Sequence, residues 1–408
     1  MSNIVTVTLD NAAYGGDSIG RLPDGRAVFV PFGIPGETVR IRITQDKKKF
    51  ARGEIVEVLE PSPLRIEALC PHFTECGGCH YQHIAYHQQL QIKGKVLRDQ
   101  LERIGRLVSP PVEAVVPSPN EFNYRNQVKF HLDQSGQPGF IRANKRGVMG
   151  ITECYLPELP LVDIWPLLQI DPESGLSALG LRLGIEDDVM VTLESKHPFD
   201  ADFNIETLPV SVVHRSPGHT EVLAGSDYTI MQVKDRQFRV SGGSFFQVNT
   251  RLAEQMVDKI EAAMPDEPGL VLELYSGVGL FSAFIAPRAD KLISVEASEN
   301  AVEDFVDNLD EFDNVELYQG PVEDIIPNLT VKPNVVLADP PRTGLHKKVI
   351  ETLISMQPDL LVYISCDPST LARDSKLLTE GGFTPQKFIP FDFFPQTYHI
   401  ETLSIWTR

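Results

Sequence analysis

Cysteine is scarce in this chain, and its odd count excludes a fully paired disulfide framework. Five of the 408 residues are cysteine, and the N-terminus lacks the basic-then-apolar segment of a secretory signal. Without such a signal, cysteines more often bind metal or act in catalysis than form disulfides. We therefore expect all five to have chemical roles.

Long apolar runs are also missing from the sequence. No window reaches the roughly 18 apolar residues that a membrane-spanning helix needs, which excludes that class of membrane protein. A chain of 408 residues is too long for one hydrophobic core and is expected to divide into two or three domains. We expect a cytoplasmic monomer without a membrane partner.

Positive charge is in deficit, because 37 Lys and Arg face 56 Asp and Glu, for a net charge of -19. Affinity for nucleic acid comes largely from Lys and Arg that neutralise phosphates, so the composition opposes general nucleic-acid binding. One short stretch is basic nevertheless, with Arg40, Arg42, Lys47, Lys48, Lys49 and Arg52. This stretch is either a local RNA-binding stripe or the solvated loop of a strand hairpin.

The spacing of apolar residues divides the chain into three segments. Residues 1–60 contain short alternating runs separated by Pro and Gly turns, which predicts a small OB-like β-barrel. Residues 61–240 combine a cysteine-rich loop, a helix over 87–106 and several strands, which indicates an antiparallel α+β domain. We expect that helix to pack on the C-terminal domain.

Residues 241–408 alternate short apolar strands with helical segments. This pattern predicts a doubly wound parallel sheet, whose ligands bind at the carboxyl ends of the strands. The predicted strands cover 270–275, 291–296, 315–318, 335–338, 360–365 and 387–391.

A Gly-x-Gly turn follows the first of these strands. Gly277 and Gly279 let the backbone approach a ligand, and Glu296, at the end of the next strand, can accept hydrogen bonds from both hydroxyls of a ribose. The third glycine of a dinucleotide site is missing, which favours S-adenosylmethionine over a nicotinamide cofactor. The alternative is a tight strand-to-helix turn without a ligand.

Two further strands end in polar motifs. The sequence Asp339-Pro-Pro-Arg342 stiffens the chain so that its two charged side chains face the cleft. The sequence Ser365-Cys366-Asp367-Pro368 places a thiol just before a helix, whose first-turn amides favour a thiolate. The alternatives are a rigid turn with solvated charges and a small buried cysteine.

Such a thiol fits methylation at C5 of uracil, a carbon too weakly nucleophilic to take a methyl group unaided. Addition of Cys366 to C6 activates C5, and a base must later remove the C5 proton so that the cysteine can leave. Glu401 is our candidate for the base, although a surface strand position is the alternative. Asp339 and the substrate-binding Arg342 would orient the ring or stabilise its charge.

The remaining cysteines form a second motif. Cys70, Cys76 and Cys79 lie on one glycine-containing loop, and Cys154 follows far downstream. Four thiolates suit either zinc or an iron-sulfur cluster, and the spacing does not choose between them. The alternative is four unligated core thiols.

These motifs together resemble the RNA uracil-5-methyltransferase family, in particular its ribosomal-RNA members, across nearly the whole chain. The resemblance implies a TRAM barrel, a central domain with a [4Fe-4S] cluster loop, and a Rossmann-like class I methyltransferase domain. The matching motifs lie at 245–249, 277–279, 339–342, 365–368 and 399–402. Glu273 and Ser276 depart from the common residues, outside the expected chemistry.

The resemblance also implies roles for individual residues. Cys366 is the expected nucleophile and Glu401 the proton-removing base. The expected contacts of S-adenosylmethionine are Gln247, Tyr275, Glu296 and Asp339, and the expected cluster ligands are Cys70, Cys76, Cys79 and Cys154.

The expected substrate is RNA, and the barrel and cysteine loop favour ribosomal RNA over uridine 54 of transfer RNA. Two rival functions remain open on sequence alone. One is methylation of an exocyclic amine, which would leave Cys366 without a task. The other is a non-catalytic RNA-binding or assembly factor.

Overall fold

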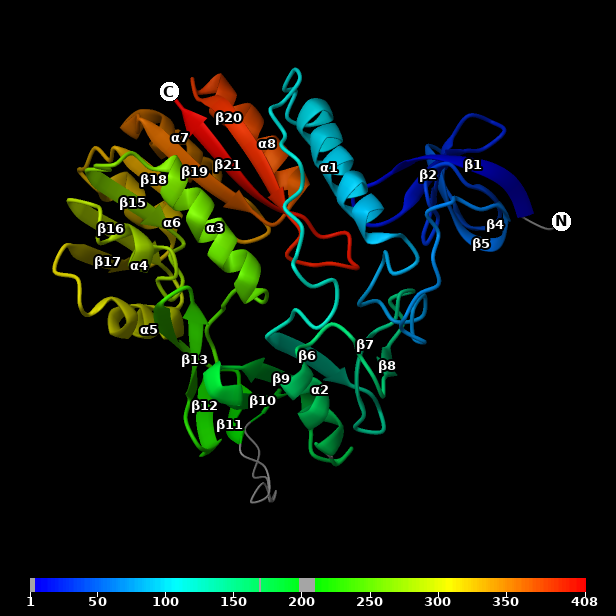
Figure 1. The fold of residues 1–408 in the computed structure, drawn as a ribbon, viewed down its shortest axis with the longest axis horizontal. Coiled ribbons are helices and arrows are strands. Elements are labelled where there is room, and N and C mark those ends of the chain that lie inside the picture. The colour runs from blue at the N-terminus through cyan, green and yellow to red at the C-terminus, as the bar shows by residue number, and fades with distance from the viewer. Residues whose placement is uncertain (1–3, 169, 198–209) are drawn as a thin grey trace.

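The computed structural model describes residues 4–168, 170–197 and 210–408. It has three parts: an N-terminal barrel, a central sheet and a C-terminal sheet covered by helices (Figure 1). None of the helices in these ranges is long and apolar enough to span a membrane. The multidomain α/β architecture predicted from the sequence is confirmed.

The N-terminal part is a closed barrel of five strands in the order β1-β2-β3-β5-β4. The alternation of apolar and polar residues fills its interior with Val, Leu and Ile side chains, including Leu9, Val28 and Ile41. This confirms the predicted small barrel. Its strands are β1 (Ile4–Ala12), β2 (Ser18–Arg21), β3 (Ala27–Val30), β4 (Thr38–Asp46) and β5 (Phe50–Glu60).

Helix α1 (Tyr86–Arg103) follows the cysteine-rich loop and lies between the barrel and the C-terminal sheet (Figure 1). Its buried Leu97 and Leu101 share a hydrophobic core with the C-terminal sheet. Lys93 of the same helix is buried and pairs with Asp392 at 2.5 Å. The helix therefore joins the N-terminal half of the chain to the C-terminal domain.

The central part is a seven-stranded sheet in the order β12-β11-β10-β9-β6-β7-β8. Its pairs are antiparallel except β10 and β11, which run parallel, so the predicted antiparallel sheet is wrong at this one pair. Its elements are β6 (Gln127–Leu132), β7 (Pro138–Ile141), β8 (Val148–Gly150), α2 (Leu159–Ile164), η1 (Trp165–Leu167), β9 (Leu176–Leu183), η2 (Ile185–Asp187), β10 (Val189–Ser195), β11 (Val210–Ser216) and β12 (His219–Ala224).

The C-terminal sheet has the order β17-β16-β15-β18-β19-β21-β20, and only its last strands, β21 and β20, depart from parallel pairing. A hairpin, β13 (Tyr228–Val233) and β14 (Arg236–Ser241), precedes it. The other elements are α3 (Thr250–Ala263), β15 (Leu270–Leu274), α4 (Ser282–Ile285), β16 (Lys291–Glu296), α5 (Glu299–Leu309), β17 (Val315–Gln319), α6 (Val322–Ile325), η3 (Ile326–Asn328), β18 (Val335–Ala338), α7 (Lys347–Met356), β19 (Leu360–Ser365), α8 (Pro368–Glu380), β20 (Thr384–Phe391) and β21 (Glu401–Thr407).

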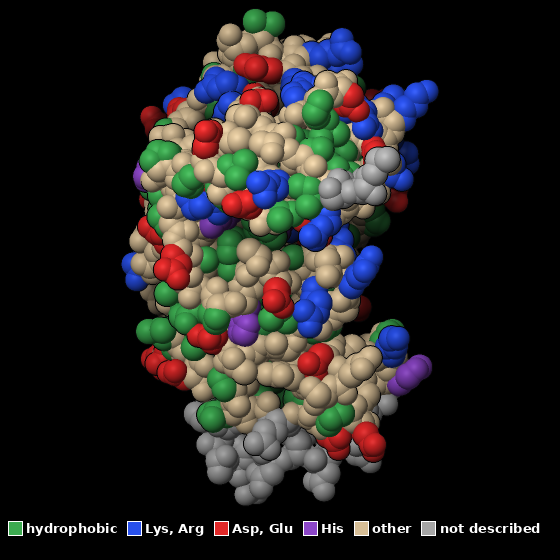
Figure 2. Space-filling view, turned by 90° about the vertical axis from the view of Figure 1, so that its right-hand side faces the viewer, with side chains coloured by type: hydrophobic (Ala, Val, Ile, Leu, Met, Phe, Trp, Pro, Cys, Tyr) green, Lys and Arg blue, Asp and Glu red, His purple; other side chains and the backbone are tan. Residues whose placement is uncertain are grey.

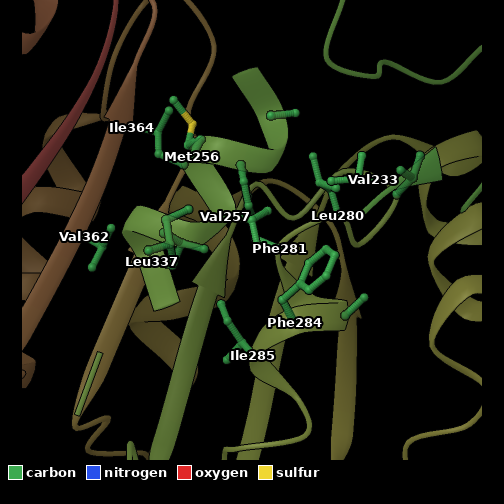
Figure 3. Packing of buried hydrophobic residues seen from close by; sticks show 14 of the residues in the cluster. Val233, Met256, Val257, Leu280, Phe281, Phe284, Ile285, Leu337, Val362 and Ile364 are labelled. Carbon is green, nitrogen blue, oxygen red and sulfur yellow. The ribbon is translucent and has the colours of Figure 1, made fainter. Parts of the chain in front are cut away.

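One large core holds this domain together. Figure 3 shows Met256 and Val257 of α3 among side chains of the sheet and of the segment around α4. Val233 of the preceding hairpin belongs to the same core, so the packing of the C-terminal domain extends upstream of residue 241. The buried sheet is a rigid frame for the strand ends described next.

Candidate active site

Four parallel strands place the predicted motifs at one edge of the C-terminal sheet. β15, β16, β18 and β19 run in the same direction, so their carboxyl ends lie together. β21 runs antiparallel and begins there with Glu401, and the next residue, Thr402, faces Ser365 in the register. The sheet therefore brings together the glycine loop, Glu296, Asp339, Cys366 and Glu401.

The glycine loop turns sharply after β15 because three residues have left-handed backbone angles. Their φ values are 62° at Tyr275, 56° at Gly277 and 86° at Gly279. A Cβ built on Gly277 would meet no atom within 4 Å, so a ligand has room to approach there. A Cβ on Gly279 would meet Leu309 at 2.3 Å, so the packing of α5 also requires glycine at this position.

The Glu296 side chain lies beside this turn and is hydrogen-bonded to it. One carboxylate oxygen accepts a hydrogen bond from the Gly277 amide at 2.8 Å. The other accepts from the amides of Ala297 and Ser298 at 2.8 and 2.7 Å. A carboxylate has about four acceptor positions, so the group is held in place and still has acceptor capacity. This geometry fits the hydroxyls of a ribose.

Gln247 lies in the segment before α3, and its neighbour Phe246 shares a hydrophobic core with Val278 of the glycine loop. Gln247 is buried, and its carbonyl accepts a hydrogen bond from Asn126 of the central domain at 2.9 Å. Asn249 caps the helix by accepting from the Leu252 amide. Phe245, two residues before Gln247, is 68% exposed, which is unusual for a large aromatic side chain.

A further buried carboxyl group lies inside β15, near the same edge. Glu273 of β15 is 2% exposed and accepts a hydrogen bond from Ser282. Burial, with the nearby charges of Asp339 and Glu296, raises the pKa of Glu273 to about 8. The signal was a carboxylate inside an otherwise apolar strand, which is rare unless the group has a partner or a task.

Cys366 is half-buried at the end of β19 among three charged groups. Burial and the charges of Glu401 and Asp339 raise the pKa of its thiol to about 12, while Arg342 acts in the opposite direction. Burial raises the pKa of Asp339 to about 7 and that of Glu401 well above its usual range. Burial therefore disfavours the charged forms of the thiol and of both carboxyl groups.

The first turn of α8 does not act as predicted on the thiol. Asp367 caps this helix, and one of its carboxylate oxygens accepts hydrogen bonds from the amides of Ser369 and Thr370 at 2.8 and 3.0 Å. These amides are therefore occupied and cannot stabilise a thiolate at Cys366. Arg342, whose side chain is exposed, remains the positive group near the sulfur.

The four remaining cysteines line one cavity beneath the barrel, together with aromatic residues such as Phe140. A Cβ on Gly77 would lie 2.5 Å from the carbonyl oxygen of Ile141, so the loop needs glycine there to pack on β7. The cysteines form no disulfide. They are Cys70, Cys76, Cys79 and Cys154.

Burial in this cavity favours neutral thiols over thiolates. Burial raises the pKa of Cys79 to about 12 and that of Cys154 to about 11, while the Arg125 guanidinium acts in the opposite direction on both. In the described ranges, no three His, Cys, Asp or Glu side chains converge closely enough to bind a metal ion. A single zinc would need its four sulfurs about 2.3 Å from one point.

The basic stretch of the barrel is partly neutralised by neighbouring acids. Arg40 pairs with Glu57 at 2.9 Å, and Arg52 with Asp17 at 2.7 Å. Lys47, Lys48 and Lys49 remain exposed at the turn between β4 and β5. Figure 2 shows Lys and Arg interspersed with Asp and Glu over the face that carries the barrel, not one continuous positive patch.

Comparisons with known proteins agree with this architecture. A family profile described as TRAM domain matches residues 3–56, and one described as tRNA (Uracil-5-)-methyltransferase matches residues 193–332 and 323–408. Uncharacterized RNA methyltransferases of Aquifex aeolicus and Chlorobaculum tepidum are 33% and 32% identical to the chain. The alignments cover 98% and 100% of this chain and 97% and 96% of the relatives.

A solved structure is similar over the whole length. It is the tRNA (uracil-54, C5)-methyltransferase of Pyrococcus abyssi in complex with S-adenosyl-L-homocysteine, with a TM-score of 0.74 and 26% identity. The match covers 98% of this chain and 99% of the other. The chain therefore belongs to the uracil-5-methyltransferase family of S-adenosylmethionine-dependent RNA methyltransferases, and it carries a TRAM domain at its N-terminus.

Proposed function

We propose that the protein transfers a methyl group to C5 of a uridine in RNA through a covalent adduct between Cys366 and C6 of the base. The observation that carries the proposal is the position of the Cys366 thiol. It lies at the same sheet edge as the glycine loop and next to the charges of Glu401, Asp339 and Arg342. Methylation of an exocyclic amine would require no thiol there.

The chain's own residues supply the covalent chemistry. The thiolate of Cys366, formed by loss of its proton, bonds to C6, and the electron pair of the C5–C6 double bond moves to C5. C5 then bonds to the methyl group as the bond between that methyl group and the donor's sulfur breaks, its electron pair staying on the sulfur. Glu401 then takes the C5 proton, the double bond re-forms, and the bond between sulfur and C6 breaks. The raised pKa of Glu401 makes it a stronger base once it has lost its proton.

S-adenosylmethionine, when bound, supplies a methyl group on a positively charged sulfur. We propose that the open face of Gly277 and the carboxylate of Glu296 hold its nucleoside, with Gln247, Tyr275 and Asp339 at the remaining contacts. A positive charge beside Cys366 lowers the pKa of its thiol, which opposes the two neighbouring carboxyl groups. Arg342 acts in the same direction and contacts the uracil ring.

We further propose that Cys70, Cys76, Cys79 and Cys154 hold a [4Fe-4S] cluster. The shared cavity and the neighbouring cation Arg125 support this, since a cluster bound by four thiolates is negatively charged. Anaerobic purification should give brown protein with about four iron atoms per chain, and Cys154→Ser should lower the iron content. Colourless protein with stoichiometric zinc would contradict the proposal.

For the target we propose ribosomal RNA, because the sequence motifs resemble in particular the ribosomal-RNA members of the family. A second candidate is uridine 54 of transfer RNA, because the enzyme of Pyrococcus abyssi that acts there matches this chain end to end. That full-length match shows that the architecture alone does not separate the two targets. The protein is proposed to act as a cytoplasmic monomer.

Mapping of 5-methyluridine in a deletion strain tests the activity and the target together. Ribosomal and transfer RNA are compared with those of the parent strain and of strains complemented with wild type or Cys366→Ala. Loss of one 5-methyluridine, restored by wild type alone, is expected. Unchanged 5-methyluridine with a lost N-methyl base would support the exocyclic-amine rival, and unchanged modification throughout would support a non-catalytic factor.

A further inference from the structure

The loop between β1 and β2 leaves the barrel and reaches the catalytic edge of the C-terminal sheet. Its Tyr14 donates a hydrogen bond from the phenol to Oδ2 of Asp367 at 2.9 Å. Asp367 directly follows Cys366 in the chain. A residue of the barrel thus touches the segment that carries the proposed nucleophile.

Asp367 has both carboxylate oxygens engaged. Oδ1 accepts from the amides of Ser369 and Thr370 and so caps α8, while Oδ2 accepts from Tyr14. Two anchors therefore fix the backbone just after Cys366: one is local to the helix, and the other comes from the barrel.

Gly16 gives a second, independent sign of close contact. Its φ is +94°, and a Cβ at this position would lie 3.2 Å from the Tyr398 ring and 3.3 Å from His80. The barrel loop thus fits against both the cysteine-rich segment and the C-terminal loop with no room for a side chain. The conformation and the space both require glycine.

Ring contacts continue this surface toward the active site. The rings of Tyr14 and Tyr398 meet edge to face at 5.7 Å, and Tyr398 lies 4.6 Å from His80 and 4.3 Å from His399. We call these four residues the aromatic wall. Three distant parts of the chain build it, and it ends two residues before Glu401.

We propose that the barrel loop forms one side of the catalytic pocket and that Tyr14 is a positioning residue for Cys366, acting through Asp367. The proposal rests on the function proposed above and deepens it. The domain expected to bind RNA then also helps to set the geometry of the chemical step.

The charges around Cys366 give the direction of the effect. Glu401 and Asp339 oppose ionisation of the thiol, Arg342 favours it, and Asp367 is the next residue. The hydrogen bond from the Tyr14 phenol holds the Asp367 carboxylate in one position. Its removal therefore makes the thiolate less favourable and its position less defined.

Alkylation of Cys366 by iodoacetamide tests this without any RNA. The rate is measured at several pH values from the mass spectrum of the Cys366 peptide, which separates this thiol from the other four. Tyr14→Phe should slow the reaction about tenfold at pH 8, the loss typical of one hydrogen bond to a charged group. Tyr228→Phe, whose ring lies under Arg239 in the hairpin, is the control and should change nothing.

An Asp367→Asn background tests the route of the effect. If Tyr14 acts through Asp367, Tyr14→Phe should change the rate less than twofold in this background. A full tenfold effect there, or none in the wild-type background, would overturn the proposal.

Adduct formation with 5-fluorouridine RNA gives the functional readout. With saturating RNA, Tyr14→Phe should form the adduct about tenfold more slowly, while affinity for S-adenosylmethionine stays within twofold. Weaker RNA binding with an unchanged adduct rate would make Tyr14 an RNA contact only and overturn the proposal. If the wild type forms no adduct, the proposed function fails, and the alkylation comparison still decides the role of Tyr14.

Discussion

The carboxyl edge of the C-terminal sheet and the cysteine cavity are both lined by ionisable groups, but different structures support them. The edge is built from the ends of strands inside a buried sheet, which hold Cys366 and Glu401 beside each other despite unfavourable burial. The cavity is built from loops that pack against β7. The edge is therefore preorganised for chemistry, whereas we propose that order in the cavity depends on the cluster that it binds.

The comparison is tested most strongly by Cys366→Ala. Loss of a covalent nucleophile should reduce single-turnover methyl transfer at least about 10⁴-fold. The free energy of unfolding in urea should change by less than about 1 kcal/mol, because the half-buried sulfur leaves little space behind. Substantial remaining activity would mean that the edge does not use the thiol.

Glu401→Gln separates two steps at the same edge. Adduct formation and methyl transfer should still occur, but removal of the C5 proton should slow by about 10² to 10⁴-fold. A methylated covalent complex with ordinary uridine RNA should therefore accumulate on denaturing gels. Rapid turnover without such a complex would assign the base to another residue.

Lys93→Met tests the buried ion pair that joins α1 to Asp392, the residue after β20. Lys93 and Asp392 are 1% and 0% exposed in their side chains, so loss of the cation leaves a buried unpaired carboxylate. The variant should be destabilised by about 3–5 kcal/mol in urea unfolding. Lys291→Met breaks the exposed pair with Glu316 and should cost less than about 1 kcal/mol. Equal losses of unfolding free energy in the two variants would show that the buried pair contributes no more stability than the exposed pair.

Glu273 makes the stability of the edge depend on pH. Its folded pKa of about 8 lies above the ordinary 4.5, so its favourable contribution is complete below about pH 4.5 and is lost as pH rises through 8. Glu273→Gln cannot titrate, and its stability relative to wild type should therefore rise by on the order of a few kcal/mol from pH 5 to pH 8. Parallel urea-unfolding curves for both proteins at the two pH values would contradict this.

Gly77 and Gly78 test how closely the cysteine loop packs against β7 at the cavity. Gly77→Ala would place a methyl group 2.5 Å from the Ile141 carbonyl, whereas Gly78→Ala meets its nearest atom, the sulfur of Cys76, at an ordinary 3.5 Å. We expect a loss of about 1–3 kcal/mol and a lower metal content for the first variant only. Thermal unfolding and metal analysis measure both effects. Equal behaviour of the two variants would mean that the loop can shift freely.

Local patterns predicted much of the fold and the position of the site. The alternating runs gave the barrel, and the alternation of strands and helices put Gly277, Asp339 and Cys366 at one sheet edge. Occupation of the α8 amides was also readable, since Asp before Pro is a common start of a helix. At this position the Asp367 cap outweighs the helix dipole.

The features that escaped prediction depend on distant contacts. Gly279 is required by Leu309 of α5, and Lys93 is held by Asp392 about 300 residues away. The contact of Tyr14 with Asp367 joins the first and last domains. No window of sequence contains both partners of such a contact, so periodicity and motifs cannot reveal it.

The central claim is tested most directly by mass spectrometry of wild-type protein incubated with S-adenosylmethionine and RNA that contains 5-fluorouridine. Fluorine at C5 cannot be removed as a proton, so the reaction should stop at a covalent complex. The account predicts a methylated fluorouridine attached to the peptide that carries Cys366. Attachment to another residue, or unmodified protein together with methylated RNA, would contradict it.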